Sequence, residues 1–162
     1  MKKLLIFIFT IFASYSVNAA WITNVEESIF GDNKANMIGE IKNSKSAIVF
    51  QCDKDNLRIS YVELGSDKKM NPIPVTLLMK IDDGNVIEFQ AILGRKNSEA
   101  VAATADDKEK IISLLQQLRI AKKKFLAGIS VDDSDFKQSF SGNVSGSTTA
   151  VNKFITACNI NI

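Results

Sequence analysis

Two cysteines, Cys52 and Cys158, are the residues whose chemistry constrains this sequence most directly. A pair of thiols can form a structural disulfide, cycle between redox states or hold a metal ion. Redox motifs place their cysteines close together in the sequence, and metal sites need further Cys or His ligands, so neither alternative fits. We therefore expect a structural disulfide, which would contribute on the order of 4–5 kcal/mol in the chain-entropy model.

The sequence contains no histidine, and this removes several classes of catalysis. Ser-His-Asp and Cys-His nucleophiles need the imidazole as a base, and histidine is also the commonest metal ligand. No serine lies in a nucleophile elbow, so acyl transfer has no support. We expect no catalytic residue, no metal site and no cofactor.

Pairs of neighbouring carboxylates are the remaining candidates for acid–base catalysis or calcium binding. Each pair lies at a predicted turn or helix start, where acidic residues are favoured for backbone reasons. The turn interpretation is therefore preferred, and a hydrolase that uses paired carboxylates is kept as a third hypothesis. The pairs are Glu26-Glu27, Asp82-Asp83, Asp106-Asp107 and Asp132-Asp133.

A basic cluster could contact a membrane surface, an acidic glycan or a partner protein. Its members are Arg119, Lys122, Lys123 and Lys124. Cations also complement the dipole at a helix C-terminus, and this structural interpretation is the one we favour. The four residues stay candidates for contact with a partner.

Residues 1–19 have the pattern of a cleaved secretory signal peptide. Lys2 and Lys3 precede an apolar run over residues 4–13, and small residues lead to a cleavage site after Ala19. The run is shorter than the roughly 20 apolar residues that a membrane span needs. We expect a periplasmic or secreted protein that does not span the membrane, in a compartment that oxidises cysteines.

Charge argues against a nucleic-acid partner. The full sequence has 20 basic and 18 acidic residues, but Lys2 and Lys3 leave with the signal peptide. The mature chain is then neutral, whereas nucleic-acid binding requires a basic face.

Apolar residues that alternate with polar ones predict a series of strands. A helix is expected from Lys108, capped by Asp106 or Asp107, and a second one is expected with Ser147 or Thr148 as its cap. Residues 21–36 are expected to be an irregular, surface-packed lead-in with a helical turn around residues 26–30. The predicted strands cover residues 35–41, 46–52, 57–62, 75–81, 86–92, 100–105, 125–131 and 136–141.

This order of elements favours an α+β fold over a parallel α/β sheet, because strands and helices do not alternate regularly. We expect residues 20–162 to form a single exported domain. Its architecture would be a curved antiparallel β-sheet or a small sandwich with two packed helices and one disulfide. The disulfide would attach the last helix to the strand over residues 46–52.

Several short motifs resemble a known layout. Trp21 follows the leader, and a strand ends on cysteine in Ala47-Ile-Val-Phe-Gln-Cys52. The chain ends with Gly146-Ser-Thr-Thr-Ala-Val151 and Phe154-Ile-Thr-Ala-Cys158. This layout resembles the VasI-type accessory proteins of type VI secretion and the related invasion-associated locus B proteins. The resemblance implies a non-enzymatic accessory protein of the bacterial envelope, a Cys52–Cys158 bridge, and a Trp21 that packs at the domain edge.

Two functional hypotheses are preferred over the hydrolase hypothesis. The first is a periplasmic accessory or binding protein, not an enzyme, that contacts an envelope or secretion-system protein through a sheet face or an edge strand. The second is an inhibitor or immunity-type protein that blocks an envelope enzyme, such as a lysozyme, or a phage entry step, because a rigid disulfide-linked loop loses little entropy on binding.

Overall fold

The computed structural model describes residues 20–162 except residues 32, 43–44, 55, 66–69 and 132–133. The predicted signal peptide and the pair Asp132-Asp133 therefore lie outside the described residues. In chain order the described elements are β1 (Trp21–Glu26), β2 (Lys34–Glu40), β3 (Ser46–Asp53), β4 (Asn56–Leu64), β5 (Ile73–Ile81), β6 (Ile87–Arg95), β7 (Ala100–Ala105), α1 (Lys108–Arg119), β8 (Lys124–Ser130), β9 (Lys137–Asn143) and α2 (Ser147–Ala157).

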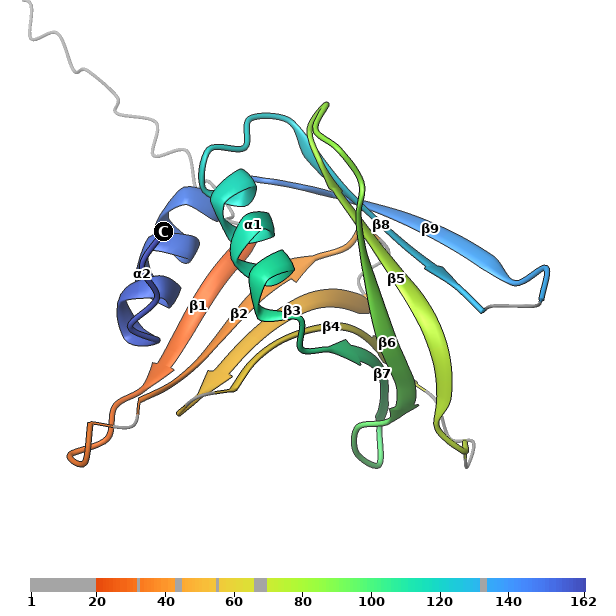
Figure 1. Ribbon diagram of the computed structural model, residues 1–162, viewed down its shortest axis with the longest axis horizontal. Coiled ribbons are helices and arrows are strands. Elements are labelled where there is room, and N and C mark those ends of the chain that lie inside the picture. The colour runs from red at the N-terminus through yellow and green to blue at the C-terminus, as the bar shows by residue number, and fades with distance from the viewer. Residues whose placement is uncertain (1–19, 32, 43–44, 55, 66–69, 132–133) are drawn as a thin grey trace, which may run out of the picture.

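All the strands belong to one antiparallel sheet in the order β1-β2-β3-β4-β7-β6-β5-β8-β9. The sheet curls, and α1 and α2 pack against its inner face (Figure 1). The predicted curved antiparallel sheet with two packed helices is thus confirmed, and the sandwich alternative is wrong. No helix in the described ranges is long and apolar enough to cross a membrane.

Alternation along the strands builds the core. Met37, Phe50, Ile59 and Ala105 face one another across β2, β3, β4 and β7, and each is at most 4% exposed. Leu114 of α1 is fully buried against this face, as is Phe154 of α2. The helices therefore occupy the inside of the curl, and the outer face of the sheet is left for solvent or a partner.

The two helices begin differently. Asp107 caps α1, because its carboxylate accepts a hydrogen bond from the Lys110 N–H at 3.2 Å. The predicted cap of α2 is wrong: the N-cap is Gly146, in the left-handed conformation, and no side chain caps this helix end. Glycine adopts that conformation without steric cost but has no side chain to offer the free N–H groups.

The predicted disulfide is confirmed. Cys52 of β3 is bonded to Cys158 at the C-terminal end of α2, with the Cα atoms 6.1 Å apart. The bond joins residues 106 positions apart, so it restricts a large part of the unfolded chain. It attaches the end of α2 to the end of strand β3.

The expected irregular lead-in is wrong, because residues 21–26 form strand β1 at one edge of the sheet. The helical turn expected around residues 26–30 is also absent, and a turn with Gly31 at φ 81° joins β1 to β2 instead. Thr23 faces inward and is buried, with its hydroxyl donating to the Ala150 carbonyl at 2.7 Å. That partner in α2 explains how a polar residue occupies an inward position.

Trp21 is 1% exposed and holds the two edges of the sheet together at one end. Its backbone N–H donates to Ser145 at 3.1 Å, and its indole Nε1 donates to the Asn143 carbonyl at 3.0 Å. The ring lies 5.3 Å from the Phe125 ring, centroid to centroid. A Cβ atom at Gly39 would overlap the indole, so β2 must have a glycine there. The tryptophan is a core residue rather than one at the domain edge.

The Gly39 contact predicts strong coupling between two substitutions. Gly39→Ala should lower the free energy of unfolding by about 1–3 kcal/mol, because the added methyl group overlaps the indole. In a Trp21→Phe background, which lacks the outer ring carbons, the same change should cost markedly less. Urea unfolding of the four proteins measures this coupling. Gly94→Ala is the matched control, because its Cβ would meet Pro72 at an ordinary 3.8 Å; strictly additive costs would contradict the prediction.

Candidate functional site

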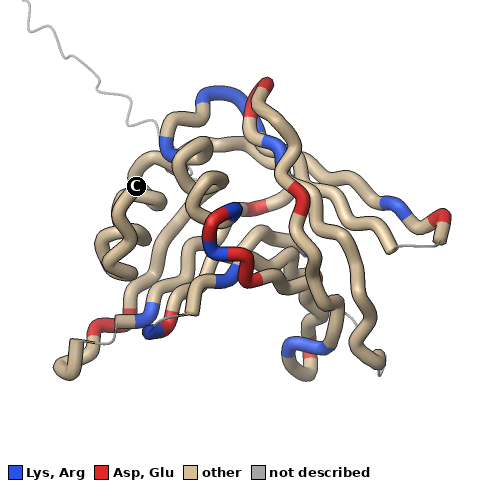
Figure 2. The backbone as a smooth tube through the Cα atoms, in the orientation of Figure 1, with Lys and Arg blue, Asp and Glu red and all other residues tan. Residues whose placement is uncertain are grey.

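The basic cluster lies against an acidic turn at one end of the molecule (Figure 2). Asp82, in the turn after β5, accepts hydrogen bonds from the backbone N–H groups of Lys122, Lys123 and Lys124 at 2.7, 2.8 and 2.9 Å. Asp83 forms an ion pair with the Lys123 ammonium. The acidic pair therefore holds the start of β8, which supports the structural interpretation of this turn.

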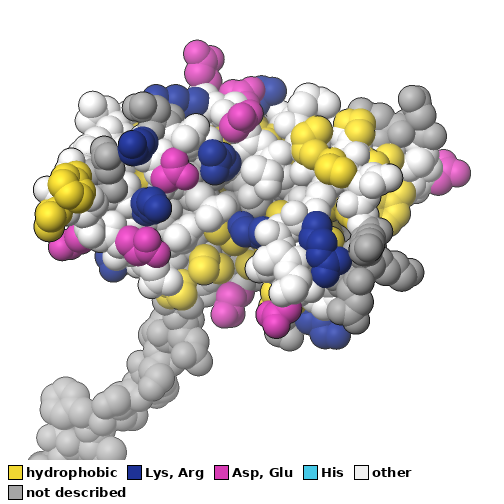
Figure 3. Space-filling model, turned by 90° about the horizontal axis from the view of Figure 1, so that it is seen from below, with side chains coloured by type: hydrophobic (Ala, Val, Ile, Leu, Met, Phe, Trp, Pro, Cys, Tyr) yellow, Lys and Arg dark blue, Asp and Glu magenta, His cyan; other side chains and the backbone are white. Residues whose placement is uncertain are grey.

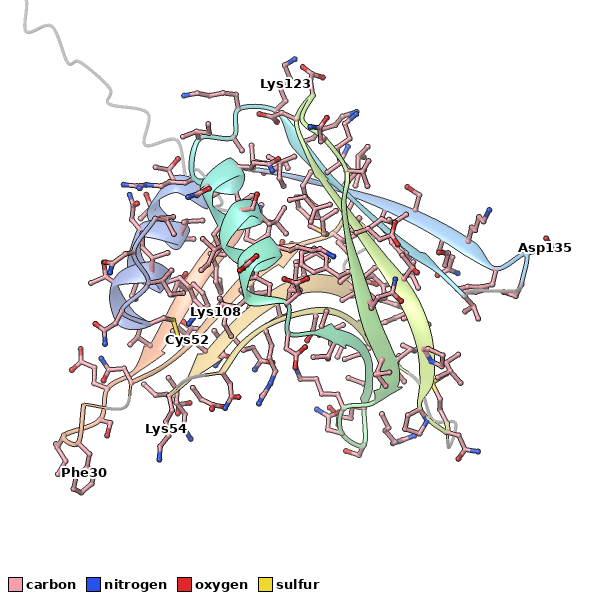
Figure 4. All side chains as sticks on the ribbon, in the orientation of Figure 1. Phe30, Cys52, Lys54, Lys108, Lys123 and Asp135 are labelled. Atoms are coloured by element: carbon pink, nitrogen blue, oxygen red, sulfur yellow. A yellow bond between two sulfur atoms is a disulfide. The ribbon has the colours of Figure 1, made fainter. Side chains whose placement is uncertain are left out.

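These contacts shift the pKa values of Asp82 and Lys123. Burial opposes ionisation of Asp82, but the three backbone N–H groups outweigh it and keep the pKa of Asp82 below its usual range. The hydrogen bond and charge of Asp83 raise the pKa of Lys123. Lys123 points outward at this end (Figure 4). In the described part of the chain, no acidic side chain pairs with the side chains of Arg119, Lys122 or Lys124.

Two of the described acidic pairs, Asp82-Asp83 and Asp106-Asp107, lie too far apart to form one catalytic site. Asp82-Asp83 lie near the end of α1 and Asp107 at its start, so this helix of 12 residues, about 18 Å long, separates them. Paired carboxylates of glycosidases lie about 5–10 Å apart. Within the described ranges no three acidic, Cys or His side chains are grouped so that they could hold a metal ion.

Sheet edges are the next candidates, because an open edge offers unpaired backbone groups to a partner strand. Helix α2 packs against β1, where the Thr23 hydroxyl donates to the Ala150 carbonyl, and the outward N–H of Trp21 donates to the Ser145 carbonyl just before the helix. The carbonyls of Ser141 and Asn143 in β9 are also occupied, by the Lys42 N–H and the Trp21 indole.

The other half of β9 is open. In an antiparallel strand every second residue directs its N–H and C=O away from the neighbouring strand. Ser141 and Asn143 do so, and by the same alternation Lys137 and Ser139 do so as well. Both are exposed, and no described residue hydrogen-bonds to their backbone groups on that side.

A groove of about 610 Å³ runs along the outer face of the sheet beside this open edge. Leu78, Leu126 and Val86 give it an apolar part, and Lys137 and Ser139 of β9 form one side. Gly128 of β8 lies between Leu78 and Ser139 in the register, so the groove exists where a side chain is missing. A Cβ at Gly128 would make only ordinary contacts of 3.5–3.7 Å, so the fold does not require glycine here.

A second exposed apolar feature is the tip of the β1–β2 turn. Ile29 and Phe30 are 95% and 85% exposed, and Phe30 points away from the molecule (Figure 4). The Ser28 N–H donates to the Asn33 side chain at 3.0 Å and the Phe30 N–H to the Ser28 hydroxyl at 3.2 Å. Seen from below, exposed hydrophobic side chains gather at several separate places on the surface (Figure 3).

Sequence reasoning missed both of these surfaces. The groove could have been found from the glycine at an outward position of an otherwise alternating strand, because Gly128 follows Leu126 at that spacing. The tip could have been found from two large apolar residues beside a glycine turn, a place where the sequence predicts a helical turn instead.

The Asp82 contacts predict a pH-dependent loss of stability. Asp82→Asn tolerates the backbone φ of 48° but removes the charge, and should lower the free energy of unfolding by about 1 kcal/mol, because the site is exposed to solvent. Asp83→Asn, which loses only a solvent-exposed ion pair, is the control and should have little effect.

The sign of the pH dependence follows from the lowered pKa of Asp82. The contribution is fully present above the unfolded value of 3.8 and is lost as the pH falls through the lower folded pKa. Denaturant unfolding from about pH 7 down to about pH 3 should therefore show the wild type and Asp82→Asn converging in acid. A gap that stays constant over this range would contradict the assignment.

Comparisons of the chain with protein-family models, with curated proteins and with solved structures find no match. The resemblance to the VasI-type and invasion-associated locus B proteins therefore stays a prediction from the sequence.

Proposed function

We propose that this chain is an exported, non-enzymatic binding protein of the bacterial envelope that takes up a strand of its partner along the open half of β9. The observation that carries the proposal is the unequal treatment of the two sheet edges. Helix α2 packs against β1 and Trp21 closes one end of β9, whereas Lys137 and Ser139 are exposed and their outward N–H and C=O groups have no partner among the described residues. Natural sheets usually protect such edges.

Strand addition needs backbone pairing for affinity and side-chain pockets for selectivity. The open edge offers the first, and the groove beside it offers the second. An added strand would lie next to Ser139, so a long apolar side chain on its outer face could reach Leu126 and Leu78 across Gly128. Lys137 at the open end favours a partner with an acidic residue there.

Export and partner class are part of the same proposal. The signal-like residues 1–19 and the single disulfide of the described residues support an oxidising, extracytoplasmic compartment. The family resemblance suggests that the partner belongs to the envelope or to a secretion system of the type VI kind. The mature chain then acts as an accessory protein rather than as an enzyme.

The test is a photo-crosslinking amino acid placed at Lys137 in cells that export the protein. We expect a defined adduct that disappears with Ser139→Pro, because proline removes an outward N–H without breaking the β8–β9 pairing. Ser139→Ala is the matched control and should keep the adduct. Gly128→Val should weaken the adduct by filling the groove while leaving the melting temperature unchanged or higher.

Two results would contradict strand addition at β9. One is an adduct that persists in a folded Ser139→Pro variant. The other is the same set of adducts from a crosslinker at Asn24 on the covered strand β1, which would indicate non-specific capture.

The exposed tip of the β1–β2 turn supports a second candidate, an inhibitor of an envelope enzyme such as a lysozyme. A protruding turn ordered by its own hydrogen bonds can enter an enzyme cleft at a low entropic cost. If so, the purified protein should slow lysozyme digestion of cell-wall material, and Phe30→Ser should lose this effect while Gly128→Val keeps it. Digestion at an unchanged rate with excess protein would exclude lysozyme as the target.

A further inference from the structure

The N-terminus of α2 lines a hollow of about 470 Å³ at the opposite end of the helix from the disulfide. The chain between α1 and β8 forms the other side, with Lys122 and Lys123 among the lining residues. The hollow does not overlap the groove beside β9. Two features that normally neutralise a helix N-terminus, a side-chain cap and an acidic residue in the first turn, are absent here.

The backbone N–H groups at this end of α2 are left without acceptors. Gly146 has no side chain to cap the helix, and the first turn contains no acidic residue. Within the described ranges the N–H groups of Gly146, Thr148 and Thr149 donate to no acceptor. Free N–H groups and the positive end of the helix dipole together favour an anion.

An independent observation is the hydroxyl of Ser147. The residue is 1% exposed and lines the hollow, and its Oγ is buried without a hydrogen-bond partner among the described residues. Because Ser147 is the first residue of the helix and the Cα–Cβ bond tilts toward the helix N-terminus, the side chain leans toward the hollow. A buried hydroxyl in this state lacks the partner that native structures normally provide, and an oxygen of a bound anion would accept its proton.

Cationic charge completes the arrangement. The Lys122 side chain has no acidic partner among the described residues, whereas Asp82 is occupied by three backbone N–H groups and Asp83 by Lys123. The nearby acids are therefore already engaged. The Thr148 hydroxyl is occupied too, because it donates to the Arg119 carbonyl at 2.7 Å.

We propose that the hollow at the N-terminus of α2 binds a tetrahedral oxyanion, a phosphate or sulfate group, through the free N–H groups, the Ser147 hydroxyl and Lys122. Several donors on a helix end, a loop and a lysine approach from different directions, and this suits an anion with several oxygens better than a halide. The group can be free phosphate or the terminal phosphate of a larger molecule.

The experiment is a titration with inorganic phosphate at constant ionic strength, followed by the backbone amide resonances of the exported, disulfide-bonded protein. We expect saturable shifts at Gly146, Thr148 and Thr149, and none with chloride. Lys122→Gln should weaken the affinity roughly three- to tenfold. Lys124→Gln makes the same change in net charge but does not line the hollow, so it should leave the affinity nearly unchanged.

Thr149→Glu is a second variant that separates binding from folding. A carboxylate in the first turn compensates the helix end internally, so this variant should be at least as stable as the wild type yet lose phosphate binding. Methyl phosphate distinguishes the sources: equal affinity indicates a site for a phosphate ester, and binding of inorganic phosphate alone indicates a site for the free ion. The proposal is overturned by equal shifts with chloride, by equal effects of Lys122→Gln and Lys124→Gln, or by undiminished binding in Thr149→Glu.

Discussion

The contact between Trp21 and Gly39 is the constraint on which the rest of this fold depends. A curled sheet has two edges, and here Trp21 brings them together. Its ring occupies the space left by Gly39, its indole N–H donates to Asn143 at the end of β9, and its backbone N–H donates to Ser145 just after that strand. Gly142 makes a similar space for Phe125, whose ring packs against the indole. Because large rings fit only where the strands lack side chains, the position of the curl is set by two glycines and two aromatic residues.

This junction also decides which surfaces are available. Trp21 fixes the segment just before α2, and the Cys52–Cys158 bond fixes its other end, so the helix is held over β1 from both sides. The same arrangement occupies the last outward carbonyls of β9 and leaves Lys137 and Ser139 open. The open half of β9 therefore comes directly before the Trp21 contacts in the chain, and the uncapped start of α2 comes directly after them.

Alternation of apolar residues predicted most strands, helical spacing predicted both helices, and the two cysteines with the signal-like leader predicted the disulfide. Each of these signals is local or compositional, so the sequence alone was sufficient for them. It was insufficient for β1, since Thr23 looks like a surface residue until its hydroxyl meets Ala150, 127 positions away. The prediction of the α2 cap was wrong for a related reason. Ser147 and Thr148 are good capping residues, but the buried Ser147 hydroxyl has no partner among the described residues and the Thr148 hydroxyl donates to the Arg119 carbonyl of α1. Long-range partners decided each of these cases.

The basic cluster shows what such partners do to a candidate site. From the sequence its four cations were equivalent, and only their partners distinguish them. Lys123 is neutralised by Asp83, and the backbone at Lys122 to Lys124 is held by Asp82, 40 to 42 residues earlier in the chain. Lys122 keeps an unpaired ammonium beside an uncompensated helix end, whereas Lys124 lies outside the hollow. Counting charges along the sequence therefore suggests a general docking surface that the folded cluster does not offer. It also does not distinguish Lys122, whose surroundings favour the proposed anion, from the other three cations of the cluster.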